Sequence, residues 1–126
     1  MTKKKNINLL TRTELELMNA LWSLGEGTVR DILGVLPHER NMAYTSAATI
    51  IKILEKKNYV KSQKKEKAHI FYPVIKKSDY EQNTIQHVVH HVFDGTPVNL
   101  VKRLLEDSKL STEERQKIKN MIKELK

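Results

Sequence analysis

Residues 41–60 have the side chains of a surface that could bind DNA. The apolar residues of this segment recur with the i, i+3, i+4, i+7 spacing of a helix packed on a core; they are Ala47, Ile50, Ile51 and Leu54. The opposite face begins with small uncharged side chains and turns basic toward its end; it comprises Thr45, Ala48, Thr49, Lys52 and Lys56. Short side chains would let a helix approach the floor of the DNA major groove, which is about 12 Å wide. The threonine hydroxyls could then bond base edges or phosphates, Ala48 could touch a thymine methyl, and the lysines could reach phosphates.

A histidine cluster is the second candidate for chemistry. His87 and His91 are four residues apart and would share one helical face, a spacing that suits zinc or copper. The pair lacks a third ligand at a fixed spacing, so exposed or interfacial histidines are the favoured interpretation and we expect no cofactor. In a dimer interface, such histidines would make association sensitive to pH near about 6.5. A metal-responsive regulator that senses through these two residues stays open as an alternative.

No motif in the sequence indicates catalysis. There is no glycine-rich phosphate loop, no G-x-S-x-G and no H-E-x-x-H. The absence of cysteine excludes disulfides, thiolate zinc sites and cysteine nucleophiles. We therefore expect a binding protein and not an enzyme.

The composition is that of a globular protein with one strongly basic part. The 126 residues are 39% hydrophobic and 30% charged, and no apolar run approaches the roughly 20 residues that span a bilayer. The start, MTKKKNINLL, lacks the apolar region of a secretory signal, so we expect a cytoplasmic protein without membrane contact. The net charge of +8 comes from residues 1–77, with 15 Lys and Arg against 7 Asp and Glu, because residues 78–126 hold 8 of each. This asymmetry points to a polyanion partner for the first part alone, although charge by itself fits a soluble basic protein equally well.

Three helices are predicted in the first part of the chain. Thr11 and Glu14 form a capping box at the start of the first helix, which Gly25 and Gly27 end. A second helix starts near residue 28 and stops at residue 37, a proline. The third helix is the segment described above, and Asn58 would end it because asparagine tolerates the left-handed conformation of a C-cap.

A β-hairpin is predicted after these helices. Two β-prone runs, residues 59–64 and 69–74, flank a charged tip at residues 65–68 whose turn type is open. Three helices followed by a hairpin predict a winged helix-turn-helix fold, mainly α with a small β-hairpin wing, and a double-stranded DNA operator as partner. The predicted DNA-binding residues are Arg12, Tyr44, Thr45, Ser46, Ala48, Thr49, Lys52, Lys56, Lys64, Lys65 and Lys67.

The rest of the chain is predicted to be a helical dimerisation segment. Ser78 and Asp79 would cap a fourth helix, Pro97 would open a fifth, and Ser111 with Glu114 would cap a sixth. We divide the chain into a DNA-binding domain at residues 1–77 and a helical domain at residues 78–126. The second part is too short for a large core of its own, so dimerisation is favoured over folding back onto the winged helix. The predicted dimer contacts are Val88, Val92, Leu100, Val101, Leu104, Leu105, Ile118, Met121, Ile122 and Leu125.

The segment AYTSAATIIKILEKKNYV resembles the recognition helix of the penicillinase and methicillin-resistance repressors, the BlaI/MecI family. That family typically shows the pattern A-Y-T-T-V-x-T-x-L-x-R-L-x-x-K-G. The upstream segment LTRTELELMNALWSLGEGTVRDIL resembles its first two helices, with Met18, Leu21 and Trp22 in its core pattern, and weaker similarity continues through SDYEQ and LSTEERQKIKNMIKEL. The resemblance implies a homodimeric transcriptional repressor that binds a dyad operator of antibiotic-resistance or related stress genes. This chain departs from the pattern at Asn58, where glycine is usual, and at Ala47, where a larger aliphatic residue is usual.

The resemblance also implies a regulatory protease or sensor as partner. In the repressors that respond to β-lactams, proteolysis cuts an Asn-Phe bond in the dimerisation helix, and the corresponding bond here joins Arg103 to Leu104. Because these residues differ, we expect the inducing signal to use a different route or a sensor of altered specificity. A winged helix that binds proteins without DNA is a further alternative, and steep salt dependence of binding would distinguish DNA contact from it.

Overall fold

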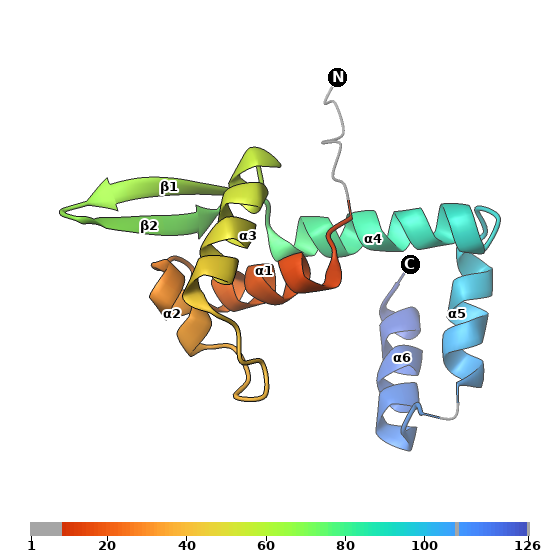
Figure 1. Ribbon diagram of the computed structural model, residues 1–126. Helices are drawn as coiled ribbons and strands as arrows, with labels where there is room; N and C mark the ends of the chain where they lie inside the picture. The colour runs from red at the N-terminus through yellow and green to blue at the C-terminus, as the bar shows by residue number, and fades with distance from the viewer. Residues whose placement is uncertain (1–8, 108, 126) are drawn as a thin grey trace. The chain divides into compact units, whose positions relative to one another are not determined.

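The computed structural model describes residues 9–107 and 109–125 and shows six helices and one hairpin in this part of the chain (Figure 1). The first group of elements is α1 (Arg12–Leu24), α2 (Val29–Gly34), α3 (Tyr44–Lys56), β1 (Val60–Lys65) and β2 (Ala68–Pro73). The second group is α4 (Lys77–Val92), α5 (Pro97–Glu106) and α6 (Thr112–Glu124). The prediction of a mainly helical winged helix-turn-helix protein is therefore confirmed.

Reciprocal capping fixes the starts of α1 and α2. The Thr11 hydroxyl accepts a hydrogen bond from the Glu14 N–H at 3.2 Å, and the Thr11 N–H donates to the Glu14 carboxylate at 2.9 Å, as the sequence predicted. Thr28 and Asp31 make the same pair of bonds at the start of α2. Gly25 ends α1 with φ 86°, in the region of backbone conformation that favours glycine.

The hairpin is antiparallel, and its register fixes a two-residue turn. Val60 faces Pro73 at one end and Lys65 faces Ala68 at the other, so only Glu66 and Lys67 form the tip. The predicted strands were each displaced by one residue, because the β-prone pattern cannot locate a turn that lacks an Asn-Gly signal. Glu66 takes the left-handed conformation with φ 57°.

Gly27 has a different role from the one the sequence suggested. It does not end α1; its N–H and C=O exchange hydrogen bonds of 3.0 and 2.8 Å with Phe71 of β2. A Cβ atom at Gly27 would lie 2.9 Å from the Cβ of Asp31, too close for the capping side chain to stay in place. The glycine therefore lets the backbone that pairs with Phe71 lie directly against the Asp31 cap of α2.

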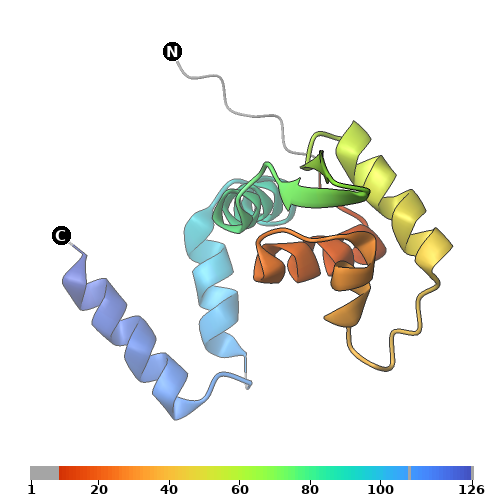
Figure 2. The same cartoon turned by 90° about the vertical axis from the view of Figure 1, so that its left-hand side faces the viewer.

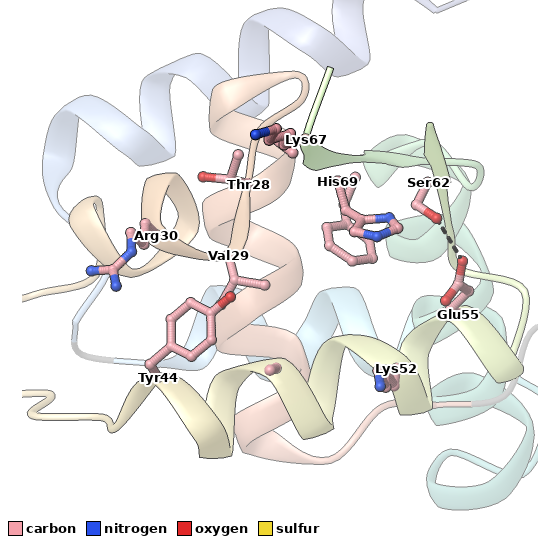
Figure 3. Close-up of a pocket in the computed structure, with 12 residues that line it drawn as sticks. Thr28, Val29, Arg30, Tyr44, Lys52, Glu55, Ser62, Lys67 and His69 are labelled. Carbon is pink, nitrogen blue, oxygen red and sulfur yellow. Dashed lines mark hydrogen bonds between the residues drawn. The ribbon is translucent and has the colours of Figure 1, made fainter. Parts of the chain in front are cut away.

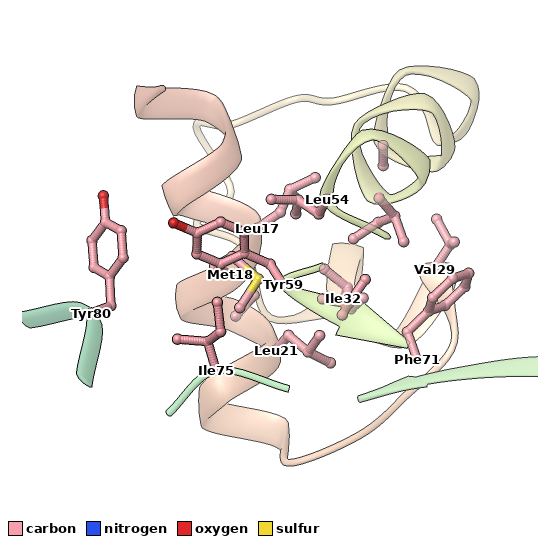
Figure 4. Packing of buried hydrophobic residues seen from close by; sticks show 14 residues of the cluster. Leu17, Met18, Leu21, Val29, Ile32, Leu54, Tyr59, Phe71, Ile75 and Tyr80 are labelled. Atoms are coloured by element: carbon pink, nitrogen blue, oxygen red, sulfur yellow. The ribbon is translucent and has the colours of Figure 1, made fainter. Parts of the chain in front are cut away.

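The hydrophobic core lies between α1, α2, α3 and the hairpin (Figure 4). Ala47, Ile51 and Leu54 of α3 are fully buried, as the apolar spacing predicted, whereas Ile50 is half-buried. Asn58 has φ 66° after α3, which confirms its predicted left-handed conformation. In both Figure 1 and Figure 2, α3 lies beside the base of the hairpin, and its buried stripe packs on α1, α2 and β1.

A partly buried ion pair connects the start of α1 to the residue that follows α3. Glu14 is 6% exposed, and its two carboxylate oxygens accept hydrogen bonds from Lys57 Nζ at 3.0 and 2.8 Å. Burial by itself raises the pKa of Glu14, but the hydrogen bond from Lys57, those from Thr11 and the charge of Lys57 together hold that pKa below its ordinary value of 4.5. Burial, the neighbouring Tyr80 and the charge of Glu14 together raise the pKa of Tyr59 to about 12.

The first turn of α4 packs with the winged helix. The helix begins at Lys77, so the prediction that Ser78 and Asp79 cap it from outside is wrong, and both lie in its first turn. The Tyr80 ring lies 5.8 Å from that of Trp22, and its hydroxyl accepts a hydrogen bond from the Leu10 N–H at 3.0 Å. The chain divides into two compact units after Asn83, within α4. The domain boundary between residues 77 and 78 stays a prediction.

The second unit, from Thr84 onward, buries little apolar surface within the single chain. No residue of α5 or α6 is buried. Leu104 is 51% exposed and Leu125 is 75% exposed, and the other large exposed apolar side chains of this unit are Ile85, Val92, Val98, Val101, Met121 and Ile122. Four more of the predicted dimer contacts are half-buried, namely Val88, Leu100, Leu105 and Ile118. None of the helices in the described residues is both long enough and apolar enough to span a membrane.

Candidate nucleic-acid interface

The outer face of α3 is available for binding. Because the apolar stripe of this helix turns inward, the side chains of Thr45, Ser46, Thr49, Lys52 and Lys56 are exposed. Tyr44, the first residue of the helix, is 48% exposed. Ala48 is half-buried and lies between the core side and the solvent side of the helix. The surface that results is small and uncharged at the start of α3 and basic toward its end.

One threonine on this face uses its hydroxyl within the helix. Thr49 Oγ1 donates a hydrogen bond to the backbone carbonyl of Thr45 at 2.9 Å. Its proton is therefore engaged, while its oxygen can still accept a bond and its methyl group can still make an apolar contact. In contact with a base, the Thr49 side chain could therefore accept a hydrogen bond or make an apolar contact. It could donate a hydrogen bond only after its bond to Thr45 opens.

A cleft of about 640 Å³ lies where α2, α3 and the hairpin meet (Figure 3). The residues that line this interface cleft are Thr28, Val29 and Arg30 of α2 and its cap, Tyr44, Ala48, Lys52 and Glu55 of α3, and Ser62, Lys67, Ala68, His69 and Phe71 of the hairpin. Three different elements thus each supply a cation to it, from Arg30, Lys52 and Lys67. The carboxylate of Glu55 also lines the cleft and accepts a hydrogen bond from the Ser62 hydroxyl at 3.1 Å. The charge of the cleft is therefore positive overall, with histidine counted as neutral.

The structure brings some of the predicted DNA-binding residues together and leaves others apart. Tyr44, Ala48, Lys52 and Lys67 line the interface cleft. Lys56 and Lys64 are exposed but do not line the cleft, and Arg12 is exposed at the start of α1. Lys65 also points elsewhere: its Nζ lies 3.7 Å from the carboxylate of Glu26, and both side chains are more than half exposed.

Among the cleft residues that the predicted site lacked are an arginine and a histidine, Arg30 and His69. The Arg30 guanidinium lies over the Tyr44 ring, 5.3 Å from its centroid. The apolar spacing of the second helix does place Arg30 on its outer side, but that spacing cannot show that this side meets the start of α3. His69 belongs to a β-prone run and gave no signal of its own; in Figure 3 its ring lies on the hairpin side of the cleft.

The three histidines of α4 form a cluster of ring contacts. The His87 and His91 rings have centroids 4.3 Å apart, and those of His90 and His91 are 4.8 Å apart. All three residues are exposed. In the part of the chain that the structure describes, no group of three His, Cys, Asp or Glu side chains is arranged to hold a metal ion. The metal-responsive alternative therefore has no structural support here.

Comparison with known proteins identifies the family. Residues 10–124 match the family model described as Penicillinase repressor. The chain belongs to the penicillinase repressor family. Members of this family are transcriptional repressors and not enzymes, which confirms both the resemblance in the recognition helix and the expectation of a non-catalytic protein.

Individual relatives are distant but extend over most of the chain. The methicillin resistance regulatory protein MecI of Mammaliicoccus sciuri is 24% identical over 113 residues, which cover 90% of this chain and 92% of that protein. The penicillinase repressor of Bacillus licheniformis is 24% identical over 120 residues, which cover 95% of this chain and 94% of that protein. The solution structure of the DNA binding domain of the repressor BlaI aligns with a TM-score of 0.50 and 24% identity, covering 64% of this chain and 94% of that one. This last comparison shows a shared winged-helix fold.

Proposed function

We propose that this member of the penicillinase repressor family is a homodimeric repressor that places α3 in the major groove of a dyad operator. The observation that carries the proposal is the two-sided nature of α3. Ala47, Ile51 and Leu54 are fully buried, while the opposite face is exposed, free of bulky charged side chains at its start, and continuous with a cationic cleft. A helix with this arrangement can approach base edges closely while cations on its flanks contact phosphates.

Dimerisation is proposed to use the second unit. The exposed apolar side chains of α4, α5 and α6 make a surface that a single chain leaves in contact with water, including Val92, Leu104 and Leu125. Apolar area removed from water contributes about 25 cal/mol per Å², so pairing of two such surfaces would stabilise the dimer. A dimer would bind two half-sites at once, and the second contact would gain from effective concentration.

The regulated genes and the signal are proposed by analogy with relatives. The names of MecI and of the Bacillus licheniformis penicillinase repressor refer to methicillin resistance and to penicillinase. We extend this to the control of antibiotic-resistance or related stress genes in the cytoplasm, with a regulatory protease or sensor as upstream partner. The bond from Arg103 to Leu104, which corresponds to the cleaved bond of β-lactam-responsive repressors, lies inside α5.

The test compares binding of the wild type, Thr49→Glu and a matched control to a duplex from upstream of the protein's own gene. Thr49→Glu puts a carboxylate on the groove-facing side of α3 and should abolish specific binding, because it would be repelled by phosphates and would bury an unpaired charge. Thr112→Glu makes the same chemical change at the exposed first residue of α6 and should bind as the wild type does. Circular dichroism checks that both variants fold. Operator binding by Thr49→Glu at wild-type strength would remove α3 from the DNA site.

The salt dependence of wild-type binding tests the wider class of function. Contact with several phosphates releases counterions, so affinity must fall steeply as salt rises, with a slope of about −0.9 per phosphate on a log–log plot. A winged helix that binds only other proteins would show no such slope with any duplex.

A further inference from the structure

Arg30 differs from other cations of the winged helix because an aromatic ring holds it. Its Cζ lies 5.3 Å from the centroid of the Tyr44 ring, within the range of about 6 Å for a cation–π contact. The contact joins the second residue of α2 to the first residue of α3. Both side chains are exposed and both line the interface cleft. The guanidinium is therefore oriented at the surface and is not buried.

No carboxylate neutralises this guanidinium in residues 9–107 and 109–125. The ion pairs of this part of the chain engage Arg40 with Glu16, Lys57 with Glu14 and Lys65 with Glu26. The neighbouring carboxylate, that of Asp31, instead accepts the Thr28 N–H at 2.9 Å in the cap of α2. The five N–H donors of Arg30 thus have no acceptor in the described residues.

We propose that Arg30, in cation–π contact with Tyr44, binds a phosphate of the DNA backbone beside the groove that α3 enters. A guanidinium presents a planar fork of donors that matches two phosphate oxygens. The Tyr44 ring lies beneath Arg30 Cζ, and the guanidinium donors are exposed at the surface of the cleft. Because the ring already restricts the side chain, less conformational freedom is lost when the phosphate binds. The inference rests on the proposed DNA-binding function and adds a contact from α2 to it.

Arg30 and Lys52 lie far enough apart to contact two different phosphates. Tyr44 and Lys52 are eight residues apart on α3, which is about 12 Å along a helix axis. This distance is close to the roughly 12 Å width of the major groove. The Arg30 guanidinium beside Tyr44 and Lys52 further along α3 would therefore contact separate phosphates and fix the register of α3 in the groove.

The experiment measures the affinity of the wild type, Arg30→Gln and Arg30→Lys for two duplexes at several salt concentrations. One duplex comes from upstream of the protein's own gene and the other is an unrelated sequence. Arg30→Gln should weaken binding to both by a similar factor, about tenfold at low salt, and should lower the salt slope by about 0.9 for each protomer in contact. Arg30→Lys should keep the wild-type slope but bind more weakly, because an ammonium on a flexible stem lacks the planar fork of donors.

A double-mutant cycle tests the role of the ring. If Tyr44 orients Arg30, Tyr44→Leu with Arg30→Gln should lose less affinity than the two single losses predict together. Lys119→Gln removes one charge at an exposed position of α6 and serves as the control for net charge; its slope should match the wild type.

The outcomes separate the two levels of the proposal. If the wild type binds neither duplex with a steep salt slope, the proposed function itself is wrong. If the wild type binds steeply and Arg30→Gln is indistinguishable from it, only the Arg30 contact is overturned. A loss confined to the upstream duplex with an unchanged slope would assign Arg30 to a base edge and would likewise overturn the phosphate contact.

Discussion

Replacing either partner of the Glu14–Lys57 ion pair should destabilise the winged helix, and the two replacements should not be equal. Glu14 is 6% exposed, whereas the side chain of Lys57 is 38% exposed. In Glu14→Gln the amide oxygen can still accept the Thr11 N–H, and Lys57 can turn to solvent. The two hydrogen bonds from Lys57 are then lost, but Lys57 regains bonds to water, so we expect a cost of about 1 kcal/mol after allowing for the exposure of Lys57.

Lys57→Met should cost more, because it leaves a buried carboxylate without its cation. Removing one partner of a buried pair costs about 3–5 kcal/mol when both ions are buried. Here the Thr11 bonds remain and one partner is partly exposed, so we expect about 2–3 kcal/mol. Urea unfolding followed by circular dichroism at one fixed protomer concentration measures both values.

The pH dependence provides the sharper test of this ion pair. The folded-state pKa of Glu14 lies below its ordinary value of 4.5, so the pair stabilises the fold fully above that ordinary value and loses its effect as the pH falls through the lowered pKa. The stability gap between wild type and Glu14→Gln should therefore close in acid. A gap of the same size at pH 7 and in acid, or a Glu14→Gln variant costlier than Lys57→Met, would refute the electrostatic account.

Two further predictions concern the second unit. Leu104→Asp should yield monomers in sedimentation equilibrium, because a charge in an apolar interface is costly unless paired. Val35→Asp changes an exposed apolar position of the first unit and should remain as associated as the wild type. A dimeric Leu104→Asp variant would exclude Leu104 from the interface. The activated protease of the classical β-lactam system should not cut this protein at Arg103-Leu104. A pocket selected for asparagine would have to desolvate the Arg103 cation at a cost of several kcal/mol, and the bond lies within helix α5. A product ending at Arg103, detected by mass spectrometry after incubation with the protease, would contradict this prediction.

The sequence predicted those features of the fold that depend on neighbours a few residues apart. The capping boxes at Thr11 and Ser111 rely on a spacing of three residues, and both are present. The inward and outward faces of α3 follow from its period, so the exposed face of this helix could be predicted as well. The cap at Thr28 was missed although it has the same spacing, because an aspartate stands where the usual pattern has glutamate or glutamine.

Contacts between distant segments could not be predicted in this way. Glu14 and Lys57 are 43 residues apart, and nothing in the period of either helix selects one as the partner of the other. The pairing of Gly27 with Phe71 and the packing of Tyr80 on Trp22 are of the same kind. Arg30 was absent from the predicted site for this reason, since its place beside Tyr44 depends on how α2 packs against α3.

The net charge illustrates how the structure adds to composition. Residues 1–77 hold 15 basic side chains, but three of them are engaged by carboxylates at positions that do not line the interface cleft: Arg40, Lys57 and Lys65. Within the described residues, the cations that line the cleft, Arg30, Lys52 and Lys67, have no such partner. The carboxylates that form ion pairs thus neutralise cations away from the cleft, and the cations at the cleft keep a positive electrostatic potential there. A polyanion would therefore be attracted to the same surface on which the exposed face of α3 begins. The positive potential and the helix face that could enter a groove thus lie together, and this favours DNA as the partner more strongly than the total charge does.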